Sequence, residues 1–385
     1  MATLAALLLL AWLWALARTI LNLALIPRLR PRQLAREPFV SIIIPARNEE
    51  RAIGRTVRAL LAQTYRNLEL IVVDDQSTDS TAFEVEQIAD PRVTLLHGEA
   101  PPSGWLGKPW ALHQGSLRAK GELLFFVDAD VFYAPAAVSA AVGRMEESGA
   151  ALMTLFPNFE MHGFWENVGM PQLALGAFML IPSWLSNRTT RPSLGIGGGT
   201  GNLVRRDAYA EADGHVTLHQ AVVDDVALAR LIRASGGRTE LVRAEDLVSI
   251  RMYHGARSII DGFTKNVYIA LGGSLWIVPF MVAFIVIVNL VPYAFLISAI
   301  EHAIRGLPVS RAEWLGCAAV ALLTLTRVVI FAALRYRIDN ALFLHPLAMM
   351  FVLYLYLRSA WRTGVRREVH WRGRTYDAAD TRFGA

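Results

Sequence analysis

The feature that most constrains this chain is an apolar run followed at once by two carboxylates one residue apart. Leu123–Val127 contains no polar residue, and Asp128-Ala129-Asp130 follows it directly. A short apolar run before a polar break is typical of a buried strand in a parallel sheet. Alternate strand residues point to the same side, so both carboxylates are expected to face one spot. Two hard oxygen ligands there suit Mg²⁺ or Mn²⁺ held against a diphosphate; a solvated turn is the simpler reading of an isolated pair.

Further apolar runs alternate with helical patterns through the middle of the chain. The runs read as strands are Phe39–Ile44, Leu68–Val73, Val93–Leu96 and Ala151–Phe156. Helices are expected up to about Gln63, around Trp110–Arg118 and from about Ala136 to Glu147. This alternation predicts an α/β domain over residues 37–254, which is long enough to bury its own core.

The two ends of the chain are too apolar for an ordinary soluble domain. Residues 1–27 are expected to form a transmembrane anchor, because Ala2–Ile26 carries Arg18 as its one charge and lacks a small-residue cleavage site. C-terminal transmembrane helices are expected within residues 274–360. The three candidates there are Leu275–Ile300, Trp314–Leu334, which Arg327 interrupts, and Ala341–Leu357, which is marginal in length.

Charge next to these spans predicts the orientation in the membrane. The first span is followed by four arginines, Arg28, Arg30, Arg32 and Arg36. They favour a protein of the inner membrane whose central domain lies on the cytoplasmic side. A basic segment at this position is also expected to contact anionic lipid headgroups. The tail, 361–385, is also basic, yet three C-terminal spans would place it on the opposite face. Either one segment is re-entrant or the tail breaks the rule.

Two segments resemble interfacial rather than spanning elements. Residues 163–185 are nearly uncharged but broken by prolines, so an interfacial segment and a buried core helix both remain open. Residues 255–273 are expected to form an interfacial helix. The single cysteine, Cys317, excludes an intramolecular disulfide, and no nucleic-acid-binding module is recognisable.

Other polar groups also stand where predicted strands end. Asp74 and Asp75 follow the second strand, and the loop 45–50 follows the first. These ends meet at one edge of the sheet, where open α/β sheets bind ligands. Carboxylates at Asp75 and Asp128 suit the imide N–H of uracil and the ribose hydroxyls. Lys108 stands at a predicted helix start and suits a phosphate, although a solvated lysine is the simpler reading.

The order and spacing of the motifs resemble glycosyltransferase family 2. The motifs are SIIIPARNEE (41–50), VVDDQSTDST (72–81), GKPWALHQG (107–115), DAD (128–130), GGTGN (198–202) and VDDVALA (223–229). The resemblance implies a GT-A (Rossmann-like) fold, a nucleotide-diphospho-sugar donor, Mg²⁺ or Mn²⁺ as cofactor, and inversion at the anomeric carbon.

The resemblance also implies roles for single residues. The donor side would be formed by Pro45, Ala46, Arg47, Glu49, Asp74, Asp75, Lys108 and Asp128. The metal ligands would be Asp128 and, more directly, Asp130, with His254 as a further candidate. The acceptor side would be lined by Gly199, Thr200, Gly201 and Asn202. Asp225 would be the catalytic base and Asp224 its acidic neighbour, although an acidic helix N-terminus explains both carboxylates more simply.

Features later in the chain narrow the resemblance to one branch. The chain lacks the Gln-x-x-Arg-Trp motif of processive polysaccharide synthases. Its Arg251–His254 and Gly262–Asn266 stretches and its Trp371–Tyr376 motif resemble carotenoid and hopanoid-associated glycosyltransferases, the hydroxychlorobactene glucosyltransferase branch above all. Lys265 is a candidate phosphate contact, and an interfacial anchor is the simpler reading of Trp371–Tyr376.

The expected function is transfer of one sugar, glucose by resemblance, from a UDP-sugar to a hydroxyl of a membrane lipid such as a carotenoid or other terpenoid. A polyprenyl-phosphate sugar synthase and a small processive synthase are the alternative enzymes. A non-enzymatic alternative is an inactive membrane scaffold or lipid translocator with a decayed transferase domain, which the retained acidic motifs argue against.

Overall fold

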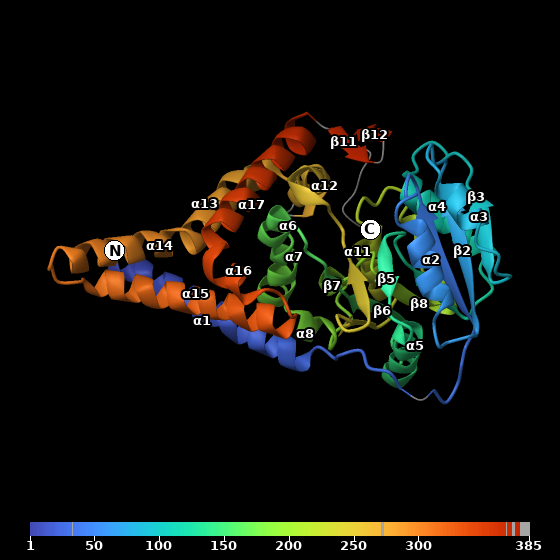
Figure 1. Cartoon of the computed structure of the whole chain (residues 1–385), viewed down its shortest axis with the longest axis horizontal. Helices are drawn as coiled ribbons and strands as arrows, with labels where there is room; N and C mark the ends of the chain where they lie inside the picture. Colours follow the sequence, from blue (N-terminus) through green and yellow to red (C-terminus); the bar gives the residue numbers. More distant parts are fainter. Residues whose placement is uncertain (33, 271–272, 367, 372–373, 378–385) are drawn as a thin grey trace. The chain divides into compact units, whose positions relative to one another are not determined.

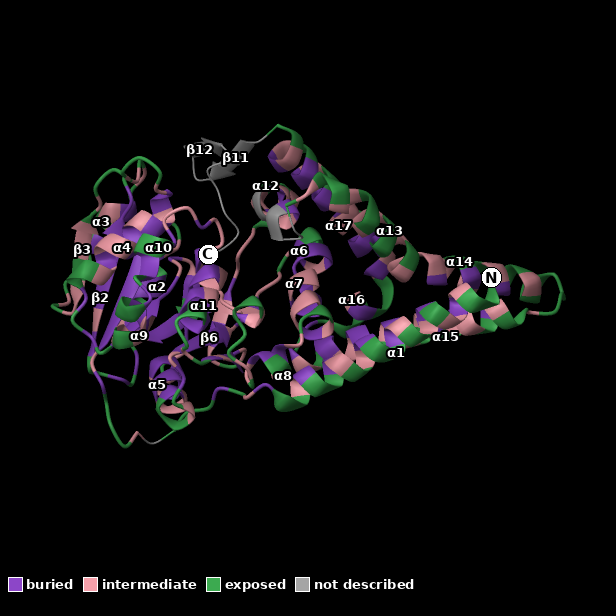
Figure 2. Cartoon of the chain, turned by 180° about the vertical axis from the view of Figure 1, so that it is seen from behind, coloured by how far each residue is buried: buried purple, intermediate pink, exposed green. Residues whose placement is uncertain are grey.

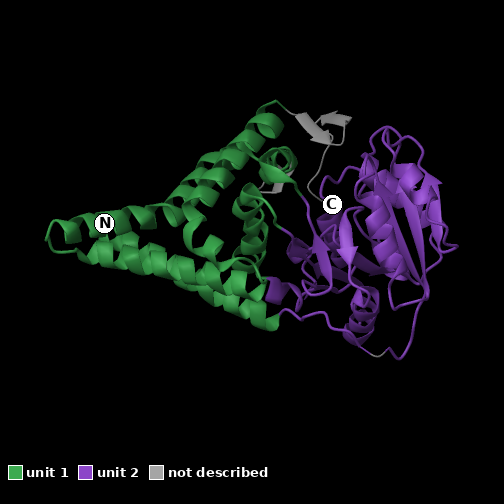
Figure 3. Ribbon diagram, viewed as in Figure 1, with its two compact units in different colours: residues 1–25, 161–182, 253–367 green, residues 26–160, 183–252, 368–385 purple. Residues whose placement is uncertain are grey.

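The computed structural model describes residues 1–32, 34–270, 273–366, 368–371 and 374–377. They fall into two compact units (Figure 3). We call residues 1–25, 161–182 and 253–367 the helical unit, and residues 26–160, 183–252 and 368–385 the sheet unit.

The sheet unit is built on seven strands in the order β3-β2-β1-β4-β8-β6-β9 (Figure 1). Their bounds are β1 Val40–Ala46, β2 Leu68–Asp74, β3 Val93–His97, β4 Leu123–Phe126, β6 Leu152–Phe156, β8 Asn202–Arg205 and β9 Thr239–Arg243. Strands β3, β2, β1 and β4 run parallel, whereas β8 is antiparallel to both β4 and β6. The predicted strands and the predicted α/β fold class are confirmed.

The strand order reverses between β1 and β4, and this reversal locates the expected ligand-binding edge of the sheet. The chain runs from β1 outward to β2 and β3, then returns to form β4 on the other side of β1. Such a reversal leaves a crevice at the carboxyl ends of the two strands that flank it. Both strands are apolar and buried, as strands covered on two faces must be (Figure 2). The crevice therefore opens next to Asp128.

Short elements complete the sheet unit. A smaller sheet contains β5 Val131–Tyr133, β10 Val248–Ile250 and β7 Asn158–Phe159, and β11 Glu368–Trp371 pairs with β12 Arg374–Asp377. The helices are α2 Ile53–Leu61, α3 Thr81–Glu86, α4 Gly107–Arg118, α5 Ala137–Ser148, α8 Ser183–Ser186, η2 Pro192–Leu194, α9 Arg206–Glu211, α10 Gly214–Thr217 and α11 Asp224–Ala234. The predicted helices therefore form, each within a few residues of its expected bounds.

Among its described residues the helical unit contains three helices that are long and apolar enough to cross a membrane, Ala2–Leu25, Leu275–Ile304 and Arg311–Ala333. Its elements are α1 Ala2–Leu25, α6 Phe164–Gly169, α7 Pro171–Leu175, η1 Gly176–Leu180, α12 Gly255–Ala270, η3 Leu275–Ile277, α13 Val278–Asn289, α14 Val291–Ile304, α15 Arg311–Ala333, α16 Ile338–Phe343, α17 His345–Ser359 and η4 Ala360–Val365. Helix α1 packs through Trp12 and its neighbours against Phe295 and Leu323 of α14 and α15.

The third expected C-terminal span, Ala341–Leu357, is not among the helices of spanning length and composition in the described part of the chain, and it stays a prediction. The helix breaks at Leu344, and Pro346 opens a new helix, α17, of 15 residues. Helix α17 continues directly into η4, so the helical stretch after this break extends from His345 to Val365. Buried Arg327 of α15 donates to the carbonyl oxygens of Asn340 (3.2 Å) and Ala341 (3.0 Å), which explains how this charge is accommodated among apolar helices.

The 163–185 stretch forms short helices whose end is tied to the first span. Asn22 donates to the carbonyl oxygens of Phe178 (2.8 Å) and Ile181 (2.9 Å), and Arg18 donates to that of Leu180 (2.7 Å). These side chains satisfy carbonyls that the end of η1 leaves without helical partners. The few polar residues of α1 thus serve to dock this stretch.

The basic segment after the first span is engaged within the sheet unit. Arg28 pairs with Glu245 (3.4 Å), Arg32 with Glu147, and Arg36 with Glu122. The expected contact of this segment with lipid headgroups therefore competes with ion pairs inside the protein. The side chains of Lys265 and of Trp371–Tyr376, and the backbone of 372–373, lie outside the described residues, so their predicted roles remain predictions.

Candidate active site

The two carboxylates that follow β4 lie beyond the end of the strand, with Asp130 in a turn. Ala129 is buried, whereas Asp128 and Asp130 on either side of it are partly exposed, as the alternation predicts. The backbone N–H of Asp128 donates to the carbonyl oxygen of Gly199 (2.8 Å). The strand end is thereby joined to the glycine-rich segment Gly197–Gly201.

The acidic pair Asp224-Asp225 forms the first turn of α11. A helix N-terminus favours carboxylates there because its backbone N–H groups lack helical partners. Asp225 accepts the N–H of Val226 (2.7 Å), and the Gly199 N–H also donates to its carboxylate. Burial raises the pKa of Asp225 in spite of these hydrogen bonds and the charge of Lys108.

Glycines let the loop approach both acidic segments closely. A Cβ on Gly199 would lie 2.0 Å from Oδ2 of Asp128, and one on Gly197 would lie 1.9 Å from the carbonyl oxygen of Asp225. No side chain fits at either position without displacing a carboxylate or the α11 backbone. The requirement for glycine here is steric.

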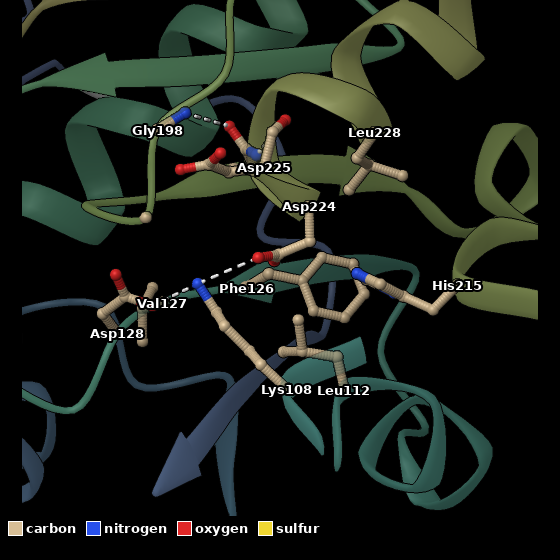
Figure 4. Close-up of a pocket in the computed structure, with 12 residues that line it drawn as sticks. Lys108, Leu112, Phe126, Val127, Asp128, Gly198, His215, Asp224, Asp225 and Leu228 are labelled. Carbon is tan, nitrogen blue, oxygen red and sulfur yellow. Dashed lines mark hydrogen bonds and ion pairs between the residues drawn. The ribbon is translucent and has the colours of Figure 1, made fainter. Parts of the chain in front are cut away.

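Lys108 joins carboxylates from two different elements (Figure 4). Its Nζ lies 2.8 Å from Oδ1 of Asp128 and 3.3 Å from Oδ1 of Asp224. Burial opposes the charge of Lys108, but Asp128, Asp224 and Asp225 outweigh it and hold its pKa well above the ordinary value. Burial raises the pKa of Asp224 to about 7, with the charge of Lys108 acting in the opposite direction.

Lys108→Met should leave the carboxylates of Asp128 and Asp224 without their cation. We expect it to lower the free energy of unfolding by about 1.5–3 kcal/mol, the usual contribution of hydrogen bonds to charged groups, and to weaken UDP binding. Added Mn²⁺ should restore part of the lost stability, because it replaces the missing charge. Denaturant unfolding with and without Mn²⁺ measures both effects. The exposed Lys120→Met is the matched control, and equal unfolding midpoints for the two variants would contradict the assignment.

The pocket around Lys108 has an acidic side and an apolar side. It is lined by Lys108, Leu112, Phe126, Val127, Asp128, Gly198, Gly199, Asn202, His215, Asp224, Asp225 and Leu228. The structure thus brings together predicted residues from four motifs that are far apart in the sequence. The apolar side, formed by Leu112, Phe126 and Leu228, shields the ion pairs from bulk water and strengthens them.

His215 is a pocket residue that the sequence does not indicate. It is buried, its Nδ1 lies 2.8 Å from the hydroxyl of Tyr209, and its ring packs against Phe126. Burial, with the positive charge of Lys108 next in effect, lowers its pKa to about 3. His215 is therefore neutral and polar at this site. A lone histidine outside any motif carries no signal by which the sequence could reveal it.

The residues predicted for the nucleoside side lie at the ends of β1 and β2. Arg47 donates to the carbonyl oxygen of Gln76 (3.0 Å), and the Asp75 N–H donates to that of Ala46 (2.8 Å). The Glu49 N–H donates to Thr81 Oγ1 (2.7 Å), so the loops after the two strands are tied together. Pro45 is the last but one residue of β1, and Asp74, the last residue of β2, is buried.

Two carboxylates are available for a divalent cation. Asp128 and Asp130 are partly exposed just beyond the strand end, Asp130 in a turn, and offer the hard oxygen atoms that Mg²⁺ and Mn²⁺ prefer. Within the residues that the structure describes, no group of three or more His, Cys, Asp or Glu side chains could hold a metal. Such a cation would take its other ligands from the donor diphosphate and water, as Mg²⁺ usually does. His254 belongs to the helical unit, where its N–H donates to Ser258 Oγ (2.7 Å).

Comparisons with known proteins agree with this geometry. Residues 41–212 match the family described as "Glycosyl transferase family 2". The chain is 27% identical over 350 residues to the 4,4'-diaponeurosporenoate glycosyltransferase of Staphylococcus aureus strain MRSA252, covering 88% of both chains. It is 27% identical over 242 residues to the enzyme of the same name from Staphylococcus haemolyticus, covering 61% of this chain and 62% of that one.

A solved structure supports the fold. The mannosyltransferase PcManGT from Pyrobaculum calidifontis, in complex with GDP-Man and Mn²⁺, superposes with a TM-score of 0.55 at 19% identity, covering 95% of this chain and 98% of that one. The mixed sheet and this likeness confirm the predicted GT-A fold, and the relatives confirm the resemblance. Residues 41–212 are therefore similar to glycosyl transferase family 2, and the chain resembles the 4,4'-diaponeurosporenoate glycosyltransferases over most of its length, which supports its identification as a glycosyltransferase.

Proposed function

We propose that this enzyme transfers one sugar, glucose, from a UDP-sugar to a hydroxyl of a membrane lipid of the carotenoid or terpenoid class, with inversion at the anomeric carbon. The observation that carries the proposal is the position of Asp225. Its carboxylate and the backbone N–H of Asp128 are both hydrogen-bonded to Gly199, in one pocket at the switch point of the sheet. Asp128, predicted to bind the sugar donor, and Asp225, the candidate base, thus lie in one site.

In this reaction Asp225 accepts the proton of the acceptor hydroxyl as that oxygen attacks the anomeric carbon. The new glycosidic C–O bond forms while the bond from the anomeric carbon to the diphosphate oxygen breaks, and UDP leaves. Lys108 supplies positive charge on the side where negative charge develops on the leaving group. A divalent cation held by Asp128 and Asp130 would add further positive charge there. Asp74 and Asp75 bind the nucleoside.

The charge of the pocket favours a neutral acceptor. Asp128, Asp224 and Asp225 face a single lysine, so an ionised acceptor beside Asp225 would be repelled. The relatives in the comparison are named for 4,4'-diaponeurosporenoate, a name that denotes a carboxylate. A carboxylate acceptor is therefore the second candidate. Its product would be an ester that alkali cleaves, whereas a glycoside resists alkali.

Three helices of spanning length support a multi-pass membrane enzyme. The basic segment after α1 favours a cytoplasmic sheet unit. With two spans after residue 274 rather than three, the basic tail returns to the same side. This removes the conflict that three C-terminal spans create. The short helices of 163–182 and α12 are then suited to the interface, where a lipid hydroxyl is presented.

One experiment tests these points together. Radiolabelled UDP-glucose, Mn²⁺ and lipids of the host are given to membrane vesicles of both orientations that contain the protein. We expect label in alkali-stable lipid with inverted vesicles and none with sealed right-side-out vesicles, because UDP-glucose does not cross the membrane. Label released by mild acid would identify a polyprenyl-phosphate acceptor, and label in long chains a processive synthase. Transfer by right-side-out vesicles alone would overturn the orientation, and failure to bind UDP would overturn the proposal.

A further inference from the structure

Asn202 is a buried amide that lies between the strands bearing the site. It begins β8, where it stands opposite Phe126 of β4 and Thr154 of β6. Its exposed fraction is 2%. Asn202 is part of the pocket wall, but so little of it is exposed that its polar atoms must find partners within the protein.

The amide of Asn202 reaches both the glycine segment and α11. Its Nδ2 donates to the carbonyl oxygen of Asp225 (3.0 Å). Its Oδ1 accepts from Thr154 Oγ1 (2.8 Å) and from the Gly198 N–H (3.5 Å). One side chain is therefore hydrogen-bonded to the backbone of the candidate base and to the loop packed against that base.

The glycine-rich segment Gly197–Gly201 lies between Asp128, on the predicted sugar-donor side, and Asp225, the candidate base. The carbonyl of Gly199 accepts the N–H of Asp128, and the N–H of Gly199 donates to the carboxylate of Asp225. Gly197 lies directly on the peptide of Asp225. A shift of this segment would change the separation of Asp128 from Asp225, which sets how far the acceptor oxygen is from the anomeric carbon.

We infer that Asn202 is a positioning residue, which acts through Asp225 by holding the start of α11 and the glycine segment in one arrangement. The inference rests on the proposed function, in which Asp225 is the base. It assigns Asn202 a role different from the acceptor contact that the family resemblance implies. An acceptor contact needs an accessible amide, whereas both polar atoms of Asn202 are buried and engaged.

The test combines Asn202→Ala with a matched control and a double-mutant cycle. Asn202→Ala should lower kcat by on the order of 10- to 100-fold, the effect of a small misplacement of a reacting group, with the Kd for UDP in Mn²⁺ unchanged. Asn187→Ala is the control, because that amide also donates to and accepts from backbone, at Leu241 of the edge strand β9. It should leave kcat unchanged per folded molecule.

In the Asp225→Asn background, Asn202→Ala should have no further effect on kcat, because a residue that acts through the base has nothing left to position. Thr154→Val removes the hydroxyl that donates to Oδ1 of Asn202 while keeping the side-chain volume. It should lower kcat less than Asn202→Ala. It serves as the test if the alanine variant does not fold.

The outcomes separate this inference from the proposed function. Unchanged kcat in both Asn202→Ala and Thr154→Val would overturn the positioning role. An equal loss from Asn202→Ala in the wild-type and Asp225→Asn backgrounds would also overturn it, since the amide would then act independently of Asp225. In both cases a strongly lowered but measurable kcat of Asp225→Asn would leave the proposed base intact. An active Asp225→Asn enzyme would overturn the base itself.

Discussion

Asp225→Asn is expected to lower the rate of sugar transfer by about 10²- to 10⁴-fold, the usual contribution of a general base, and to leave UDP binding nearly unchanged. The amide has the shape of the carboxylate but cannot accept the hydroxyl proton. The Asp225 carboxylate accepts hydrogen bonds from the backbone N–H groups of Gly199 and Val226. The side-chain oxygen of an asparagine can accept the same bonds, so the loop and helix should keep their arrangement. Transfer of labelled glucose to lipid and equilibrium binding of UDP measure the two effects.

Asp207→Asn is a close control for this substitution. Asp207 also stands in the first turn of a helix, α9, and its Oδ1 accepts the N–H of the next residue at 2.7 Å, as that of Asp225 does. It lies outside the pocket. We expect full activity from Asp207→Asn. More than a few per cent of wild-type activity in Asp225→Asn, counted per folded molecule, would contradict the role of Asp225 as base.

Asp130→Ala should abolish transfer and make the enzyme insensitive to added Mn²⁺. The segment after β4 supplies Asp128 and Asp130 as candidate ligands, and a hard cation is expected to lose much of its affinity when one of these two carboxylates is removed. Wild-type enzyme treated with a chelator should lose activity and recover it when Mg²⁺ or Mn²⁺ returns. Calorimetric titration with UDP, with and without metal, would show weak binding in the variant under both conditions.

A surface carboxylate provides the comparison for Asp130. Asp90 pairs with Arg92 in the turn after α3 and lies outside the pocket. Asp90→Ala should keep both activity and metal dependence. Metal-stimulated transfer by Asp130→Ala at the wild-type level would mean that the cation is held elsewhere or that none is needed.

Local sequence determined the strands and the chemistry at their ends. Apolar runs such as Leu123–Val127 cannot be exposed to water, so they become buried strands, and the carboxylates after them must lie at the sheet edge. The same reasoning located the spans Ala2–Leu25 and Arg311–Ala333. At Ala341–Leu357 composition predicts one continuous span, but the structure breaks the helix at Leu344 and begins a new one at His345. Hydropathy averages over a window and does not register such a break.

Contacts between distant segments were decided by the tertiary structure. Lys108 meets Asp224, and Asn202 meets the backbone of Asp225, only because β4, β8 and the start of α11 converge on one edge of the sheet. His215 enters the pocket in the same way. The physical reason is that local sequence specifies which residues are buried and which strands form. Hydrogen bonds and ion pairs between segments far apart in the chain depend on how those strands are ordered and registered.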